Sequence, residues 1–170
     1  MDALSKFKAA SGNSYLFVTT GSSWAGSSWQ TETRVNNGIA TERKFAYTSF
    51  ADVQMPATGW SEEKRQEVLA ALKMTEQGFI TSYGSSLEET LEWVEETSQL
   101  GAHQNTSACP YLTLDAVYDE AKKVWLKKRE NTEFFFETTN NGMISTCGYT
   151  PNNCMDDCFR GIRITRIEAL

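Results

Sequence analysis

The sequence has little of what most catalytic and nucleic-acid-binding proteins require. It contains a single histidine, three prolines and no apolar run long enough to span a membrane. Acidic side chains outnumber basic ones, 22 to 16, which leaves a formal net charge of −6. Because nucleic acids are bound by basic surfaces, this acidic protein is expected to have no nucleic-acid partner. No transmembrane segment is expected either.

Established catalytic motifs are also missing. The sequence has no GxSxG, no P-loop, no GxGxxG and no HExxH. His103 lies in a polar stretch six residues before Cys109, and a Cys–His nucleophile pair would require the two side chains to face each other. We interpret His103 as a surface histidine near a disulfide. We therefore expect no cofactor, no metal site and no identifiable catalytic residue.

The chain is long enough to form one domain with its own core. It has 170 residues, of which 40% are hydrophobic and 12% aromatic, as is typical of globular proteins. Two segments carry β-hairpin signals, and residues 61–100 between them have helical patterns. The sequence therefore predicts a single domain over residues 1–170, with 61–100 as a helical insertion between two hairpin-bearing halves.

Two Asn-Asn-Gly turns mark the hairpins. Residues 29–35 alternate in polarity before the turn at 36–38, and residues 39–47 alternate after it. The second turn, at 140–142, follows three consecutive phenylalanines, Phe134 to Phe136, which predict a central strand buried on both faces. Further strands are expected over residues 15–20, 143–149 and 160–167.

Three helices are expected between the hairpins. Ser61 with two following acids predicts a helix that ends near Gly78, and Ser86 with Glu89 forms a capping box for a second one that ends at Leu100. Thr113 is the N-cap of a third, which runs to about Arg129. The order predicts an α+β fold with an antiparallel sheet of about five or six strands and two to three helices packed on one face.

The four cysteines indicate an oxidising compartment. They are Cys109, Cys147, Cys154 and Cys158, and the absence of a CxxC pair disfavours zinc. We expect two disulfides, with the connectivity open and free thiols as the alternative. The chain starts without a positive-then-apolar leader, so the protein is cytoplasmic or has lost a signal peptide. The cysteine cluster favours the second, and hence an extracytoplasmic or secreted protein.

Several segments resemble a family of small bacterial exported or lipid-anchored domains of unknown function. The similar segments are the strand start at 15–17, the first hairpin turn at 34–38, the helix start at 113–121, Gly148-Tyr149-Thr150-Pro151, and Asp156-Asp157 before the last strand. The helices within 61–100 are additional, and the family's early cysteine pair is absent. The resemblance implies an exported domain of this fold and implies no chemistry.

Two tryptophans are the best functional indication. Trp24 and Trp29 lie in a Gly/Ser-rich loop, where they form either a ligand platform or a lid over the sheet. We expect an exported, disulfide-linked, non-catalytic binding or envelope-associated domain that uses these two residues for a protein, peptide or carbohydrate ligand. A hydrolase of carbohydrate or peptide with unidentified carboxylates is the first alternative. A protein inhibitor or interaction module is the second.

Overall fold

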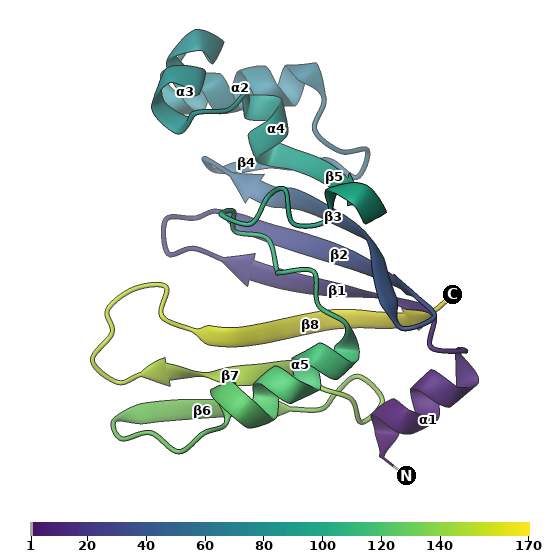
Figure 1. The fold of residues 1–170 in the computed structure, drawn as a ribbon. Helices are drawn as coiled ribbons and strands as arrows, with labels where there is room; N and C mark the ends of the chain where they lie inside the picture. The colour runs from purple at the N-terminus through teal and green to yellow at the C-terminus, as the bar shows by residue number, and fades with distance from the viewer. Residues whose placement is uncertain (1) are drawn as a thin grey trace.

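Eight antiparallel strands form one sheet in the computed structural model, which describes residues 2–170 (Figure 1). The strand order is β4-β3-β2-β1-β8-β7-β6, and β5 also pairs with β3. The bounds are β1 Tyr15–Ser22, β2 Ser28–Asn36, β3 Ile39–Phe50, β4 Val53–Gln54, β5 Glu92–Glu96, β6 Thr132–Glu137, β7 Thr146–Pro151 and β8 Arg160–Ala169. The predicted α+β class and antiparallel sheet are confirmed, but the sheet has more than the expected five or six strands.

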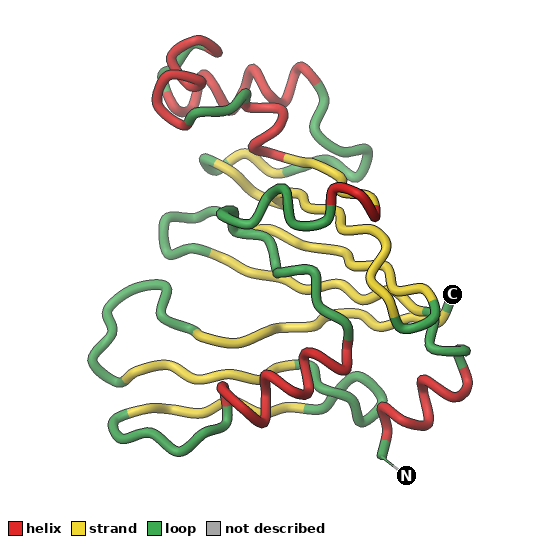
Figure 2. The backbone as a smooth tube through the Cα atoms, in the orientation of Figure 1, coloured by secondary structure: helices red, strands yellow, loops and turns green. Residues whose placement is uncertain are grey.

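Five α-helices accompany the sheet within residues 2–170, where two or three were expected. They are α1 Ala3–Ala10, α2 Glu62–Leu72, α3 Glu76–Tyr83, α4 Leu87–Leu91 and α5 Leu114–Glu120, with the 3-10 turn η1 Thr97–Gln99 and the π-helical turn η2 Ala121–Trp125. In Figures 1 and 2, α5 lies over β7 and β8, whereas α2, α3 and α4 lie beyond β4 at one edge of the sheet. None of the helices within residues 2–170 is both long and apolar enough to span a membrane.

The predicted helix from Ser86 to Leu100 is wrong in its second half. The Ser86 hydroxyl caps α4 as expected, accepting a hydrogen bond from the Glu89 amide at 3.2 Å. The helix nevertheless ends at Leu91, and the next five residues form β5 against β3. Pairing with an existing strand outweighs the local helical pattern. The other predicted helix in this region is divided at Lys73, which adopts a left-handed φ of 56° before α3 begins.

Two hydrophobic clusters hold these elements together. The larger one lies between the sheet and the helices α1 and α5, and the Tyr15 hydroxyl accepts a hydrogen bond from the Leu114 amide at 2.9 Å within it. The smaller one joins α2, α3 and α4 to β3 and β4 around Trp60 and Phe79. Because the helical insertion has its own cluster, it lies at the sheet edge and not on the face covered by α5.

The three phenylalanines lie in β6, which is an edge strand and not the central strand that the sequence predicted. β6 pairs with β7 alone, and Phe134 and Phe136 are 39% and 57% exposed. Phe135 packs edge-on against Phe159 with 5.9 Å between the ring centres, and the partly exposed Phe134 ring lies 6.5 Å from that of Tyr149. The prediction failed because a run of apolar residues does not show where a strand lies in the sheet or whether other elements pack on both of its faces.

Candidate functional site

A buried ion pair joins the strands β3 and β5. Arg43 and Glu95 are direct cross-strand partners, and their side chains are 2% and 1% exposed. The guanidinium donates two hydrogen bonds to the carboxylate, Nε to Oε2 at 3.0 Å and Nη2 to Oε1 at 2.8 Å. This two-pronged geometry is the strongest that a carboxylate can form with a side chain. The pair therefore provides a fixed polar centre beneath the loop that follows β5.

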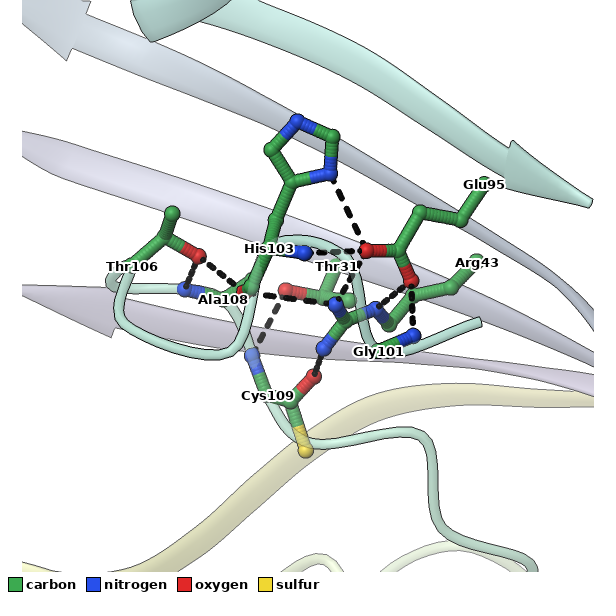
Figure 3. Close-up of polar contacts among 8 residues, drawn as sticks. All are labelled: Thr31, Arg43, Glu95, Gly101, His103, Thr106, Ala108 and Cys109. Carbon is green, nitrogen blue, oxygen red and sulfur yellow. Dashed lines mark hydrogen bonds and ion pairs between the residues drawn. The ribbon is translucent and has the colours of Figure 1, made fainter. Parts of the chain in front are cut away.

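The same pair anchors the loop that crosses the sheet toward α5 (Figure 3). The Glu95 carboxylate accepts hydrogen bonds from the backbone amides of Gly101 at 2.9 Å and His103 at 2.6 Å. Arg43 donates to the carbonyl oxygens of Cys109 at 3.0 Å and His103 at 3.3 Å. Burial by itself raises the pKa of Glu95, but the hydrogen bonds from Arg43 and the two amides outweigh it and hold that pKa at about 2.

His103 is the third member of this arrangement. Its Nδ1 lies 3.0 Å from Glu95 Oε1, and its ring stacks on Trp93 with 4.2 Å between the ring centres and 9° between the planes. Figure 3 shows the Nε2 side of the ring directed away from the carboxylate. Because an ionised carboxylate only accepts hydrogen bonds, Nδ1 carries the proton in the neutral ring and Nε2 is left as an acceptor. The His103 side chain is 36% exposed, as a surface residue would be, but nearby Cys109 is a free thiol, so the prediction that His103 lies near a disulfide is wrong.

An aromatic cleft of about 670 Å³ opens beside His103. Its aromatic residues come from β3, β5 and the end of α3, and its polar residues come from the turn before α4, from α4 itself and from the loop after β5. We use the name aromatic cleft for the space lined by Phe45, Tyr47, Tyr83, Ser85, Glu89, Thr90, Trp93, His103, Asn105, Thr106 and Ser107.

The rings in the aromatic cleft differ in what they can offer a ligand. Trp93 stacks on both Phe45 and His103, and the Arg43 guanidinium lies 4.8 Å from its ring centre, so this ring is already packed by three neighbours. Tyr83 stacks on Phe79 through one face, with 4.3 Å between the ring centres, and remains 52% exposed. Tyr83 is thus the ring with a free face, while Trp93 serves to hold the imidazole in place.

The two predicted ligand-binding tryptophans do not form one platform. Trp24 is 74% exposed in the turn between β1 and β2, where its amide donates to Asp157 Oδ1 at 2.9 Å. Trp29 is half-buried, lies over Gly21 and contacts Tyr47 edge-on at 5.9 Å. It lines a separate cleft of about 460 Å³, which it shares with Cys109 and Cys158. A role of either tryptophan in binding stays a prediction.

The described part of the chain, residues 2–170, contains one disulfide where two were expected. Cys154 is bonded to Cys158 in the loop between β7 and β8, with 6.1 Å between the Cα atoms. Cys109 and Cys147 are free thiols, which corrects the prediction for these two residues. Burial raises the pKa of both thiols to about 11, so neither is a reactive thiolate near neutral pH.

Neither the arrangement of metal-binding side chains nor the similarity to known proteins indicates a second kind of site in the part of the chain that the structure describes. Within residues 2–170, no three His, Cys, Asp or Glu side chains lie close enough together to hold a metal ion. Comparisons of the chain with protein-family models, with curated proteins and with solved structures find no match in any of the three. The resemblance to exported domains of unknown function therefore stays a prediction, and the aromatic cleft with His103 is the candidate site.

Proposed function

We propose that this protein is a non-catalytic binding domain whose ligand is a neutral carbohydrate held in the aromatic cleft. The observation that carries the proposal is the combination of one open aromatic face with a ring of hydrogen-bonding groups around the same cavity. Sugars present apolar C–H faces that pack on aromatic rings and hydroxyls that need polar partners. Ligand sites of this kind are concave, with a few placed polar groups that fix orientation.

The polar groups of the aromatic cleft suit hydroxyl recognition. Glu89 accepts hydrogen bonds, Asn105 both donates and accepts, and His103 offers Nε2 as an acceptor whose direction is fixed by Glu95. The nearest fixed cation, Arg43, is fully used by Glu95 and by backbone carbonyls. With no free cation among the residues that line this cleft, a neutral sugar suits it better than an anionic ligand does.

The disulfide supports an extracytoplasmic location for this binding domain. The Cys154–Cys158 bond fits an oxidising compartment, where disulfides persist. The two remaining thiols are compatible with that compartment because burial keeps them protonated. An exported or envelope-associated sugar-binding domain is therefore the proposed role.

Affinity electrophoresis and calorimetry with defined oligosaccharides test the proposal. The probes are cellohexaose, xylohexaose, chitohexaose and maltohexaose. We expect one of them to bind, and we expect Tyr83→Ala and Asn105→Ala each to weaken it about tenfold or more, which corresponds to roughly 1.4 kcal/mol. Glu89→Gln removes a charge but keeps the capping box with Ser86, so its effect reports on the ligand and not on the helix.

Glu88→Gln is the matched control for Glu89→Gln. Glu88 lies on the same helix, but its carboxylate is 3.5 Å from Arg65 and it does not line the aromatic cleft. We expect this variant to bind as the unmodified protein does. Failure of all four oligosaccharides to bind, or equal binding by the cleft variants, would refute the proposal.

A second function, hydrolysis in the same cleft, is favoured by the Glu95–His103 contact. An imidazole oriented through Nδ1 by a carboxylate can take a proton from water at Nε2 while the water oxygen attacks an ester carbonyl. The Glu95 carboxylate orients and stabilises the ring as its charge changes. Hydrolysis of 4-nitrophenyl acetate that is lost in His103→Ala and reduced in Glu95→Gln would support this function, and equal rates in all three proteins would exclude it.

A further inference from the structure

β6 leaves one edge of the sheet open. It is the last strand in the order and pairs with β7 through Thr132 to Glu137 on one side only. On the other side, alternate backbone amides and carbonyls have no strand among the described residues, 2–170, to pair with. An edge of this kind is a template for an additional strand, which would gain main-chain hydrogen bonds.

The side chains of β6 give this edge two different faces. Phe136 lies opposite Cys147, which is buried in the larger cluster, so Phe134 and Phe136 lie on the core side of the sheet, although both are exposed. Glu133 and Glu137 lie on the opposite side, one at each end of the phenylalanines, and both are exposed. Within residues 2–170 neither carboxylate forms an ion pair, and the side-chain carboxylate of Glu137 accepts a hydrogen bond only from the Thr146 hydroxyl, at 2.9 Å.

The charge pattern decides whether this edge suits a second copy of the chain or a segment of a different protein. Residues 132–138 read Thr-Glu-Phe-Phe-Phe-Glu-Thr, which is the same in both directions. In the antiparallel register that pairs the whole segment with a second copy, Glu133 of each chain would lie opposite Glu137 of the other. Like charges in direct cross-strand positions are destabilising. Two chains with a net charge of −6 also repel each other.

We propose that the open edge of β6 binds an extended segment of a partner protein in which a Lys or Arg stands on each side of three apolar residues. The apolar residues of that segment would lie beside Phe134 and Phe136, and its basic residues would lie opposite Glu133 and Glu137. The segment adds one strand to the sheet. This interaction surface is independent of the aromatic cleft, so its failure would leave the carbohydrate proposal untouched.

Two short peptides that differ only in charge test this proposal on the full chain. The first is acetyl-Thr-Lys-Val-Val-Val-Lys-Thr-amide, and the second has Glu in place of both lysines. In titrations followed by amide NMR, we expect the lysine peptide to shift the amides of residues 132–137, with at least tenfold tighter binding than the glutamate peptide. The binding should weaken as salt is added, because exposed charges are screened.

Charge reversal in the protein provides the matched variant. In the double variant Glu133→Lys and Glu137→Lys, the preference should invert toward the glutamate peptide, and the unchanged amide spectrum away from β6 shows that the fold is kept. Equal affinity for both peptides, shifts away from β6, or no binding would overturn the proposal. A concentration-dependent dimer in sedimentation that is lost in Phe136→Lys would also overturn it, because a second copy would then be the occupant.

Discussion

Arg43 and Glu95 lie directly opposite each other in the pairing of β3 with β5, although 52 residues separate them in the chain. Both side chains are buried, and together they bind backbone groups of Gly101, His103 and Cys109 in the loop after β5. The same pair sets the position of His103. Stability and the geometry of the candidate site therefore depend on one ion pair.

Removal of one partner of this pair should destabilise the fold strongly. Glu95→Ala leaves the Arg43 guanidinium buried without a counter-charge, and we expect the free energy of unfolding to fall by about 3–5 kcal/mol. Urea denaturation followed by circular dichroism measures the change. Glu96→Ala, on the exposed face of the same strand, is the control and should change it by less than about 0.5 kcal/mol. Equal effects of the two substitutions would show that the buried pair does not form.

The lowered pKa of Glu95 also predicts a pH dependence of stability. The pKa of this carboxyl is about 2 in the folded protein against an ordinary value of 4.5, so the folded state binds its proton less readily than the unfolded state. Its contribution, on the order of 3 kcal/mol, is complete above about pH 5 and is lost as the pH falls toward 2. Glu95→Gln should give a flatter stability curve in that range. If the free energies of unfolding of the two proteins change with pH in parallel, the lowered pKa of Glu95 is contradicted.

The elements that depend on local chemistry could be predicted from the sequence. The Asn-Asn-Gly turn at 36–38 fixes the first hairpin, since Asn37 and Gly38 both adopt positive φ angles. Thr113 caps α5 as expected, through the amide of Ala116 at 3.3 Å. Strand β5 could not be predicted in this way, because its residues have a helical pattern and become a strand only when β3 is beside them.

The candidate site could not be predicted either, because its residues come together only when β5 pairs with β3. The sequence nevertheless contains one indication of a buried polar site. Arg43 lies on the face of the first hairpin that also carries Phe45, and an arginine on an apolar face requires a buried acid. Any of the 22 acids could have supplied it, and sequence spacing does not select Glu95. The position of His103 follows from Glu95, so its role could not be predicted either.

Alkylation of the cysteines tests the disulfide assignment. With iodoacetamide under denaturing, non-reducing conditions, we expect two labels by intact mass, on Cys109 and Cys147, and four after reduction. Under native conditions both thiols should react slowly, because burial holds each pKa at about 11. No label without reductant would indicate a second bridge. Four labels without reductant would remove the support for an oxidising compartment.

Alanine substitution of the two tryptophans separates a ligand platform from a lid over the sheet. Trp24→Ala should change the free energy of unfolding by less than about 0.5 kcal/mol, because the ring is largely exposed and its backbone amide, which binds Asp157, is kept. Trp29→Ala should cost about 2 kcal/mol, because its ring covers Gly21 and packs against Tyr47. Urea denaturation of both variants measures the difference. If Trp29→Ala costs no more than Trp24→Ala, the ring of Trp29 is not packed in solution, and both tryptophans are then available as a mobile pair for a ligand.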